Sequence, residues 1–365
     1  MYHDDKRIVI TLDAGGTNFV FGAMRGNRFI GKTITYPSHS DDLDKCLDTM
    51  VQGFREIISS LPQLPVAISF AFPGPADYAR GIIGGYLPNF PSFRNGVALG
   101  PMLERIFGIP VFINNDGDLF ALGEAYDGVL PEVNARISAI GGARKYTNLL
   151  GYTFGTGFGI GSVINGQLNR GNNSCIETFC LRNRHYPGCI CEESVAIRAV
   201  QREYARLSGD DASNLTPKDI CDIADGNRPG DKEAAIEAFR MFGQAAGDAI
   251  VTAVTLTDSL VVIGGGLTGA KHHIMPALLE EMRSSLSTWG GEEVSRVQMK
   301  VYNLDKEDEF REFARGGEVE LKIHGFGETV SYNPVKTTGV AISKLGASEA
   351  ISIGAYVFAL NAIDK

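Results

Sequence analysis

Two segments that each begin with a Gly-Thr pair have residue types and spacing that could carry out chemistry. Gly16–Gly22 reads GTNFVFG and Gly155–Gly161 reads GTGFGIG, so Gly, Thr, Phe and Gly recur in the same register. Each segment follows an apolar, β-like run and leads into another, which predicts two hairpins with glycine at their turns. Glycine lets the backbone approach a ligand closely, and its N–H groups can point at anionic oxygens. The repeat therefore predicts two loops that hold a polyphosphate from both sides.

A carboxylate precedes the first of these turns. Asp13 ends the apolar run before the turn residues Gly15–Asn18. Mg²⁺ is typically held by one or two carboxylates together with water and substrate phosphates, so Asp13 is a candidate for the Mg²⁺ side of a phosphate site. A plain β-hairpin with a glycine turn would explain this segment alone. The second copy at Gly155–Gly157 favours phosphate binding.

A third glycine cluster follows the apolar run Leu260–Ile263. Gly264–Gly269 fits the pattern G-x-G-x-x-G, which is typical of dinucleotide-binding turns. One interpretation is a dinucleotide-dependent oxidoreductase. The cluster lies late in the chain and no clean second βαβ unit follows, which favours a turn against which an adenosine could rest.

A polar run marks the junction between an expected strand and an expected helix. Asn114, Asn115, Asp116, Gly117 and Asp118 follow one another there. Ligand sites of α/β sheets lie at the carboxyl ends of strands, where a carboxylate could take a proton from a hydroxyl that attacks phosphorus. The alternative is that the two aspartates only cap the helix. The pattern leaves both interpretations open for Asp116 and favours capping for Asp118.

The elements that must position these residues follow an α/β order. The first part is expected as βββαβαβ, with strands at 8–13, 19–25, 28–36, 66–71 and 111–114, a helix from the cap Ser40 to Leu61, and a helix at 97–107. Later elements are expected as a hairpin at 149–164, helices at 192–207, 217–224, 231–257, 271–288 and 347–362, and a strand at 260–263. Residues 290–345 are the least readable and are expected to be an insertion of mixed structure, with Trp289 as its anchor.

Length, charge and cysteine content restrict the class of protein. A chain of 365 residues suits two domains. A net charge of −9 with no basic run argues against a nucleic-acid partner, and no apolar run approaches the length of a membrane span. Six cysteines, with no apolar leader at the polar start, favour the reducing cytoplasm.

Several segments together resemble the ROK family of sugar kinases, which are glucokinase-like proteins of the hexokinase superfamily. This resemblance implies a two-domain, actin-like ATPase (ribonuclease H-like) fold with internal duplication. The expected domains are 1–115 with 348–365, and 116–347 with an insertion near 290–340. The matching segments are Leu12–Asn18, Phe72–Asp77, Pro88–Phe90, Pro110–Glu124, Gly155–Gly161, Val262–Gly269 and the C-terminal ISKLGASEAISIGAYVFAL.

The resemblance also implies roles for individual residues. Asp116 would be the catalytic base, and Asp13 the carboxylate on the Mg²⁺ side. The sugar would be bound by Asn89, Asn115, Glu177 and Glu193. The phosphates and adenosine of ATP would contact Gly15, Gly16, Thr17, Asn18, Gly155, Thr156, Gly157, Gly264, Gly265 and Gly266.

The expected reaction is transfer of the γ-phosphoryl group of ATP to a hexose hydroxyl. The 6-OH of glucose is the first choice, and N-acetylhexosamine, mannose and fructose are alternatives. An alternative of another class is a non-catalytic sugar-sensing regulator; its relatives carry an added N-terminal DNA-binding domain, for which the first strand near residue 8 leaves no room. Resemblance further implies a homodimer that binds sugar and nucleotide.

The segment expected to bind the sugar departs from the family's sequence pattern. The family's Gly-Glu-x-Gly-His signature is replaced by Ser174–Cys180, in which Glu177 can fill the Glu role while a cysteine stands where His is expected. Either Glu192 or Glu193 could be the last sugar carboxylate, and Glu193 fits the following residues better.

The cysteines of this region do not decide whether the chain binds zinc. Four of them could ligate zinc, with His185 between them, but their spacing and the missing family histidine favour free thiols. His272 and His273, after the third glycine cluster, are expected on a solvated helix start without a role. The four candidate zinc ligands are Cys175, Cys180, Cys189 and Cys191.

Overall fold

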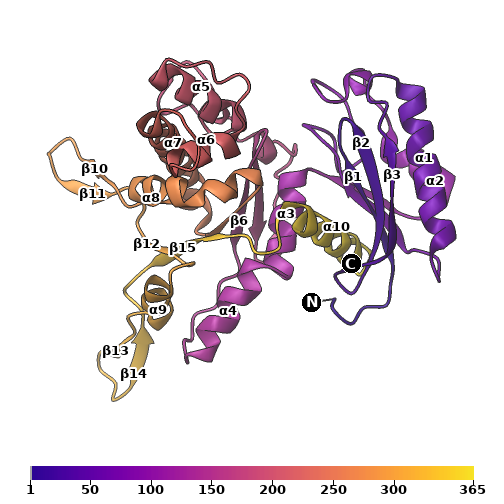
Figure 1. Cartoon of the computed structure of the whole chain (residues 1–365). Helices are drawn as coiled ribbons and strands as arrows, with labels where there is room; N and C mark the ends of the chain where they lie inside the picture. Colours follow the sequence, from indigo (N-terminus) through magenta and orange to yellow (C-terminus); the bar gives the residue numbers. More distant parts are fainter. Residues whose placement is uncertain (1) are drawn as a thin grey trace. The chain divides into compact units, whose positions relative to one another are not determined.

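The protein is described by a computed structural model that covers residues 2–365. Within these residues, two main β-sheets and two separate hairpins account for the strands (Figure 1). The first elements along the chain are β1 (Val9–Ala14), β2 (Asn18–Arg25), β3 (Arg28–Pro37), α1 (Leu43–Ser60), β4 (Ala67–Ala71), α2 (Leu99–Phe107), β5 (Val111–Asn114), α3 (Asp116–Tyr126) and α4 (Val129–Ala139).

The later elements carry the second half of the sequence. They are β6 (Leu149–Phe154), β7 (Phe158–Ile164), β8 (Gln167–Leu168), η3 (Cys191–Ser194), α5 (Ile197–Ser208), α6 (Pro217–Ala224), α7 (Lys232–Thr257), β9 (Leu260–Gly264), η4 (Gly266–Ala270), α8 (Lys271–Met282), β10 (Ser285–Ser287), β11 (Glu293–Ser295), β12 (Lys300–Asn303), α9 (Glu307–Arg315), β13 (Val319–Lys322), β14 (Thr329–Tyr332), β15 (Thr337–Ile342) and α10 (Ala347–Ile363).

One compact unit comprises the chain up to Gly128, together with Gly159–Phe179 and Ser343–Lys365. Its five-stranded sheet has the order β3-β2-β1-β4-β5. The strands β1, β2 and β3 are antiparallel neighbours, whereas β4 runs parallel to both β1 and β5. The helices α1 and α2 lie on one face of this sheet, and α10 lies on the other with α3 packed along it (Figure 1).

The helix α1 shows how local sequence sets these elements. The Asp42 carboxylate accepts a hydrogen bond from the Lys45 amide at 3.2 Å, which caps the helix. Its buried side includes Cys46, Met50 and Phe54, which join the hydrophobic core of the sheet. The sequence prediction of Ser40 as the cap was therefore wrong, because Asp42 lies directly before the first helical turn.

A second compact unit comprises Val129–Phe158 and Cys180–Ile342. Its strands β12, β15, β9 and β6 are parallel neighbours in that order. The long helix α7 is buried along most of its length and packs against α8, α5 and α6. These contacts form a helical layer that carries the segments next to the second and third glycine clusters.

The two main sheets repeat one topology. The second sheet has the order β12-β15-β9-β6-β7-β8, so β8-β7-β6-β9-β15 corresponds strand by strand to β3-β2-β1-β4-β5. The outer pairs β3–β2 and β8–β7 are antiparallel, whereas β1–β4 and β4–β5 in the first sheet, and β6–β9 and β9–β15 in the second, are parallel. The predicted internal duplication is confirmed, and the two glycine turns occupy equivalent positions in the repeat.

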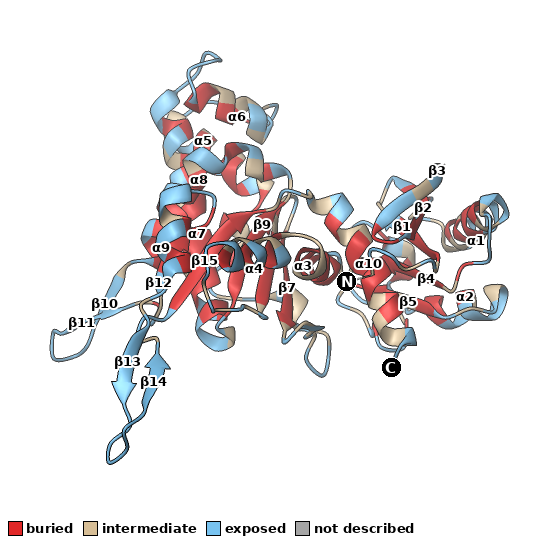
Figure 2. Cartoon of the chain, turned by 90° about the horizontal axis from the view of Figure 1, so that it is seen from below, coloured by how far each residue is buried: buried red, intermediate tan, exposed pale blue. Residues whose placement is uncertain are grey.

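Residues 285–342 contain two hairpins at the surface of the protein. The hairpins β10–β11 and β13–β14 are exposed, in contrast to the buried strands of the main sheets (Figure 2). Trp289 lies between β10 and β11 and is fully exposed, so its expected role as an anchor was wrong. The insertion of mixed structure is otherwise present as expected, although β12 and β15 belong to the main sheet.

Most helices and strands lie where the sequence predicted them, and the differences concern the residues at which they begin or end. The helix α8 ends at Met282 rather than 288, and α5 begins at Ile197 after the short helix η3. The two compact units divide the chain differently from the expected domains, and those domain limits stay a prediction. In the described part of the chain, no helix is both long enough and apolar enough to span a membrane.

Candidate active site

The junction of β5 and α3 positions the polar run Asn114–Asp118. Asn115 caps α3 by accepting the Gly117 amide at 2.8 Å, and Asp116 accepts the same amide at 2.8 Å through Oδ1. A side chain at position 117 would bring its Cβ to 2.5 Å from the Ile160 carbonyl oxygen, so only glycine fits. The structure therefore holds Asp116 in the first turn of α3, at the positive end of the helix dipole.

The pKa of Asp116 is raised above its ordinary range. The main cause is desolvation by the surrounding protein atoms, although the side chain remains in contact with solvent. The Gly117 amide opposes this shift, and the carboxylate of Asp13 adds to it. The ends of β1 and β5 thus bring two carboxylates within electrostatic reach of one another. Such a perturbed acid at a strand end is a candidate for proton transfer.

Asp118 is not a helix cap, contrary to expectation. It is buried, and its Oδ1 has no hydrogen-bond partner among the described residues. Burial raises the pKa of Asp118 to about 7, while the charge of Arg170 lowers it and that of Asp116 raises it. Asn115 performs the capping because its side chain lies before the first helical residue.

Glu177 lies within reach of the same group of acids. The Tyr78 hydroxyl lies 3.1 Å from Glu177 Oε2 and 2.9 Å from the Phe72 carbonyl oxygen. Burial raises the pKa of Glu177 to about 8; the bond from Tyr78 opposes the shift, and the charges of Asp118 and Asp116 add to it. Glu177 Oε1 is buried without a hydrogen-bond partner in the described part of the chain. An unsatisfied buried carboxyl oxygen is expected where a polar ligand completes the site.

The proline-glycine segment Phe72–Asp77 has a steric function here. A Cβ on Gly74 would collide with Glu177 Oε1 and with the Tyr78 hydroxyl. Glycine at this position is therefore required for the carboxyl group of Glu177 to lie where it does.

Arg170 is a site residue that the sequence analysis missed. Its Nη1 donates to Asn114 Oδ1 at 2.7 Å, while Asn114 Nδ2 is buried and lacks a described acceptor. Arg170 follows β8 in an exposed loop, and no motif in the sequence marks it. Its positive charge lowers the pKa of Asp118 and so partly opposes the effect of burial on that acid.

The first glycine turn is tight and lies against Asn89. The Gly15 amide donates to the Asn18 carbonyl at 3.0 Å, and the Ser38 amide donates to the Thr17 carbonyl at 2.9 Å. A Cβ on Gly16 would lie 3.1 Å from Asn89 Cβ. The structure therefore brings the expected phosphate turn and an expected sugar ligand into direct contact.

The second glycine turn is fixed by Glu192 of η3 and by residues that follow η3. Glu192 Oε2 accepts from the Phe158 amide at 3.1 Å, and the Ile197 amide donates to the Gly155 carbonyl at 2.9 Å. Arg198 donates to the Thr156 carbonyl at 3.1 Å and to Glu192 Oε1 at 2.8 Å. Arg198 is a second residue that the sequence analysis missed, because it carries no motif of its own.

Glu193 is held by arginines rather than left free. Arg198 contacts Glu193 Oε1 at 2.7 Å, and Arg202 lies 3.5 Å from Oε2. Hydrogen bonds from Arg198 lower the pKa of Glu193 below its ordinary range. The structure thus separates the two glutamates: Glu192 supports the glycine turn directly, while Glu193 stays ionised beside it.

The third glycine cluster lies next to the second turn. Gly265 has a φ of +94°, and a Cβ there would collide with the backbone of Phe154, which immediately precedes Gly155. Gly264 ends β9 and Gly266 begins η4. Glycine at position 265 is therefore required for the close approach of these two backbone segments.

The cysteines considered for zinc do not assemble within the second unit. Among the described residues, Cys175, Cys180, Cys189 and Cys191 form no disulfide. In the part of the chain that the structure describes, Cys180, Cys189 and Cys191 do not form a group of three metal ligands. A different group, which includes His272 and His273, does so and is described below.

The sequence profile of the ROK family matches residues 9–303, and the chain belongs to this family. It therefore has the actin-like ATPase fold, as expected. The solved structure of a glucokinase from Parabacteroides distasonis is 57% identical to this chain, covers 99% of each chain and has a TM-score of 0.91.

Curated relatives include both an enzyme and a regulator. The glucokinase of Thermotoga maritima is 26% identical over 308 residues, which are 76% of this chain and 87% of that protein. The xylose repressor of Bacillus subtilis is 25% identical over 270 residues, which are 69% of this chain and 60% of the repressor. Family membership alone thus leaves a choice between catalysis and sugar sensing.

Proposed function

We propose that this protein is an ATP-dependent sugar kinase that transfers the γ-phosphoryl group to the 6-OH of glucose. The observation that carries the proposal is Asp116, a carboxylate with a raised pKa at the end of β5 and the start of α3. The 57% identity to a glucokinase over 99% of both chains supports glucose as the substrate. N-acetylhexosamine, mannose and fructose are the alternatives of the same class.

Asp116 would act as the general base. Its carboxylate takes the proton of the sugar hydroxyl as that oxygen attacks the γ-phosphorus, and the ADP oxygen leaves with the electron pair of the broken bond. The raised pKa makes the Asp116 carboxylate more basic than that of an ordinary aspartate, as a general base requires. The charge of Asp13 contributes to that basicity.

Asp13 would lie on the metal side of the phosphates. Its exposed carboxylate at the end of β1, close to a second acid, fits a divalent cation that shares its coordination with phosphate oxygens. When bound, Mg²⁺ would neutralise charge on the transferred phosphoryl group. The turn Gly15–Asn18 would contact the same phosphates through its N–H groups.

The sugar would be bound by carboxyl and amide groups. Asn89, Asn115 and Glu177 are proposed as hydroxyl ligands, and Glu193 as the last carboxylate. Glu177 is the strongest candidate, because its buried Oε1 lacks a partner in the described residues and can pair with a sugar hydroxyl.

The nucleotide would be bound by the second and third glycine clusters. Gly155, Thr156 and Gly157 are proposed to contact phosphates, and Gly264, Gly265 and Gly266 to contact adenosine. Two observations favour this proposal. Glu192 and Arg198 hold the Gly155–Gly157 turn in place, and Gly265 closely approaches the strand that precedes this turn. A homodimer in the cytoplasm is proposed on the family resemblance and the free thiols.

The proposal is tested by measuring ADP release with a panel of hexoses and saturating MgATP. Glucose is expected to give the highest kcat/KM, with N-acetylglucosamine, mannose and fructose lower. A protein that binds glucose in a calorimeter but releases no ADP with any of the sugars would be a sensor, and the proposed activity would then be wrong.

A further inference from the structure

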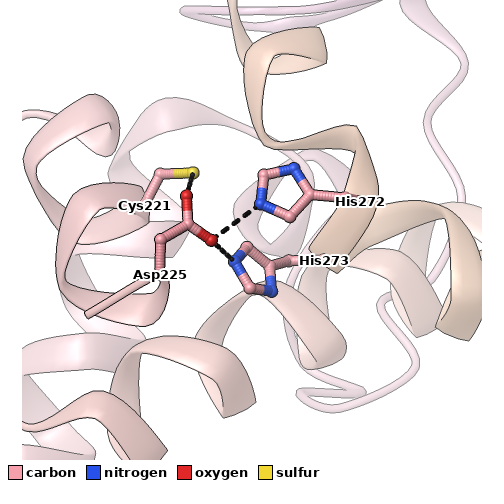
Figure 3. A group of neighbouring side chains, drawn as sticks. All are labelled: Cys221, Asp225, His272 and His273. Carbon is pink, nitrogen blue, oxygen red and sulfur yellow. Dashed lines mark hydrogen bonds and ion pairs between the residues drawn. The ribbon is translucent and has the colours of Figure 1, made fainter. Parts of the chain in front are cut away.

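A cluster of potential metal ligands lies in the second unit, away from the glycine turns. Cys221 lies on α6 and Asp225 directly follows that helix, while His272 and His273 begin α8 (Figure 3). One ligand atom from each of the four side chains lies within 4.8 Å of the other three. Two helices far apart in the sequence thus direct four donors to one point.

The contacts inside the cluster converge on Asp225. His272 Nε2 and His273 Nε2 each lie 2.8 Å from Asp225 Oδ1, and Cys221 Sγ lies 3.7 Å from Oδ2 (Figure 3). The two imidazole rings have their centroids 4.1 Å apart. A hydrogen-bonded cluster alone would need both rings to carry their proton on Nε2 and to share one oxygen.

We propose that Cys221, Asp225, His272 and His273 form a zinc site that joins α6 to the start of α8. The donor set of one thiolate, one carboxylate and two imidazoles is complete for tetrahedral Zn²⁺. Sulfur and imidazole donors select zinc over Mg²⁺ or Ca²⁺, which prefer oxygen alone.

The distances suit an ion at the centre of the cluster. At the bond lengths typical of zinc, the donors of a tetrahedral site lie about 3.3–3.6 Å from one another. The sulfur–oxygen distance of 3.7 Å is already close to this range. The two nitrogen–oxygen distances of 2.8 Å must each open by about half an ångström, which side-chain rotation can supply.

The surroundings fix the ligands and leave a route for the ion. Cys221 and Asp225 are four residues apart and so lie on the same side of α6, whose start is fixed by a capping box at Thr216. Phe239 on α7 stacks on the His273 ring with their centroids 5.8 Å apart. His272 is half-exposed, so the cluster is open to solvent on its side.

The position of Cys221 beside Asp225 also affects the protonation of its thiol. Burial raises the pKa of Cys221 to about 11, and the Asp225 charge adds to the shift. The thiol is therefore protonated in neutral solution without an ion. Zinc would displace this proton, so binding should weaken as the pH falls.

The position of the site gives it a structural role. His272 and His273 follow η4, which begins at Gly266 of the third glycine cluster. Zinc would hold the start of α8 on α6 and so restrict the turn that we propose to contact adenosine. This consequence rests on the proposed function: removing the metal should raise the KM for ATP more than the KM for the sugar.

The site itself is tested without the kinase assay, by titrating Co²⁺ into the reduced, chelator-treated full chain. One equivalent is expected to give the visible bands of tetrahedral Co²⁺ and a near-ultraviolet thiolate charge-transfer band, both removed by added Zn²⁺. Cys221→Ser should abolish the charge-transfer band. His272→Gln, at an exposed position, should weaken Co²⁺ affinity by about tenfold or more.

Matched controls decide between this cluster and other cysteines or histidines. Cys189→Ser and His324→Gln change exposed residues outside the cluster and should leave the spectra unchanged. The proposal is overturned if the wild type gives no charge-transfer band, if the band survives Cys221→Ser, or if Cys189→Ser removes it. A normal cobalt spectrum in a chain without kinase activity would contradict the proposed function alone.

Discussion

At the scale of single residues, the candidate site is a group of acids with different environments. Asp116 lies at a helix start and keeps contact with solvent, Asp118 is buried beneath it, and Glu177 is half-buried beside Tyr78. Desolvation is the largest cause of the raised pKa in all three. Three acids with separate environments can be in different protonation states at one pH, which general acid–base chemistry requires.

Asp118 should make folding stability depend on pH in a defined direction. Its pKa in the folded chain, about 7, lies above the ordinary value of 3.8, so the protonated form is favoured by folding. The stability that this group contributes is complete below pH 3.8 and is lost as the pH rises through about 7. Asp118→Asn removes the ionisation. The melting temperature of the variant minus that of the wild type should therefore increase as the pH rises from 5 to about 8.

Thermal melts of both proteins across that pH range measure the effect. Asp44→Asn, at an exposed position on α1, is the matched control and should follow the wild type. A constant difference between Asp118→Asn and wild type at every pH would show that Asp118 is ionised in the folded protein.

The sequence identified some of these residues and missed others for physical reasons. Asp116 and Glu177 were found because they lie in segments with recognisable spacing. The roles of Asp118, Arg170 and Arg198 depend on burial and on partners distant in the sequence, which spacing does not encode. His272 and His273 were expected to be free in solvent, but Asp225 reaches them from another helix.

At the scale of elements, the helix that begins with Asp116 is held by close contact with α10. A Cβ on Gly354 of α10 would collide with the Leu119 carbonyl, and one on Gly123 of α3 would collide with the Ala350 carbonyl. The two helices therefore approach at glycines on both sides. The sequence predicted each helix but not this contact, because glycine within a helix has no distinctive pattern.

Gly354→Ala should separate α10 from α3 and displace the first turn of α3. We expect a loss of about 1–3 kcal/mol in unfolding free energy, because the added methyl group overpacks a rigid contact. Kinase kcat should also fall, since Asp116 would shift relative to its substrate. Urea denaturation and initial rates measure the two effects.

Ser352→Ala on the same helix is the control for this substitution. It removes one bond to the Ser348 carbonyl and adds no steric contact. Equal stability and equal kcat in Gly354→Ala and wild type would mean that the close contact between the helices does not constrain the site.

The ends of the helices show where the local sequence is sufficient to predict the structure and where it is not. The helix α6 was predicted at its exact residues, and its start is fixed by a capping box between Thr216 and Asp219 with Pro217 in the first turn. The end of α8 was placed too late, because the residues after Met282 leave the helix for the hairpin β10–β11. That change of direction depends on tertiary structure, which a helical pattern does not report.

At the scale of the whole molecule, a duplicated sheet explains why one glycine motif occurs twice. The hairpins β1–β2 and β6–β7 occupy corresponding positions in two sheets with the same strand order. Each glycine turn therefore lies at the same point of its repeat. The duplication was predictable because both copies kept Gly, Thr and Phe. The third glycine cluster has no partner in the first repeat and was interpreted from its position after β9.

The most direct test of the central claim is glucose-dependent ADP release by Asp116→Asn, with Asp44→Asn as the control. Asparagine keeps the shape of the side chain but is no longer a base. We predict that kcat falls by about 10²–10⁴-fold while the melting temperature and glucose affinity stay close to those of wild type. Turnover by Asp116→Asn within a few-fold of the control would contradict the assignment of Asp116 as the base for phosphoryl transfer.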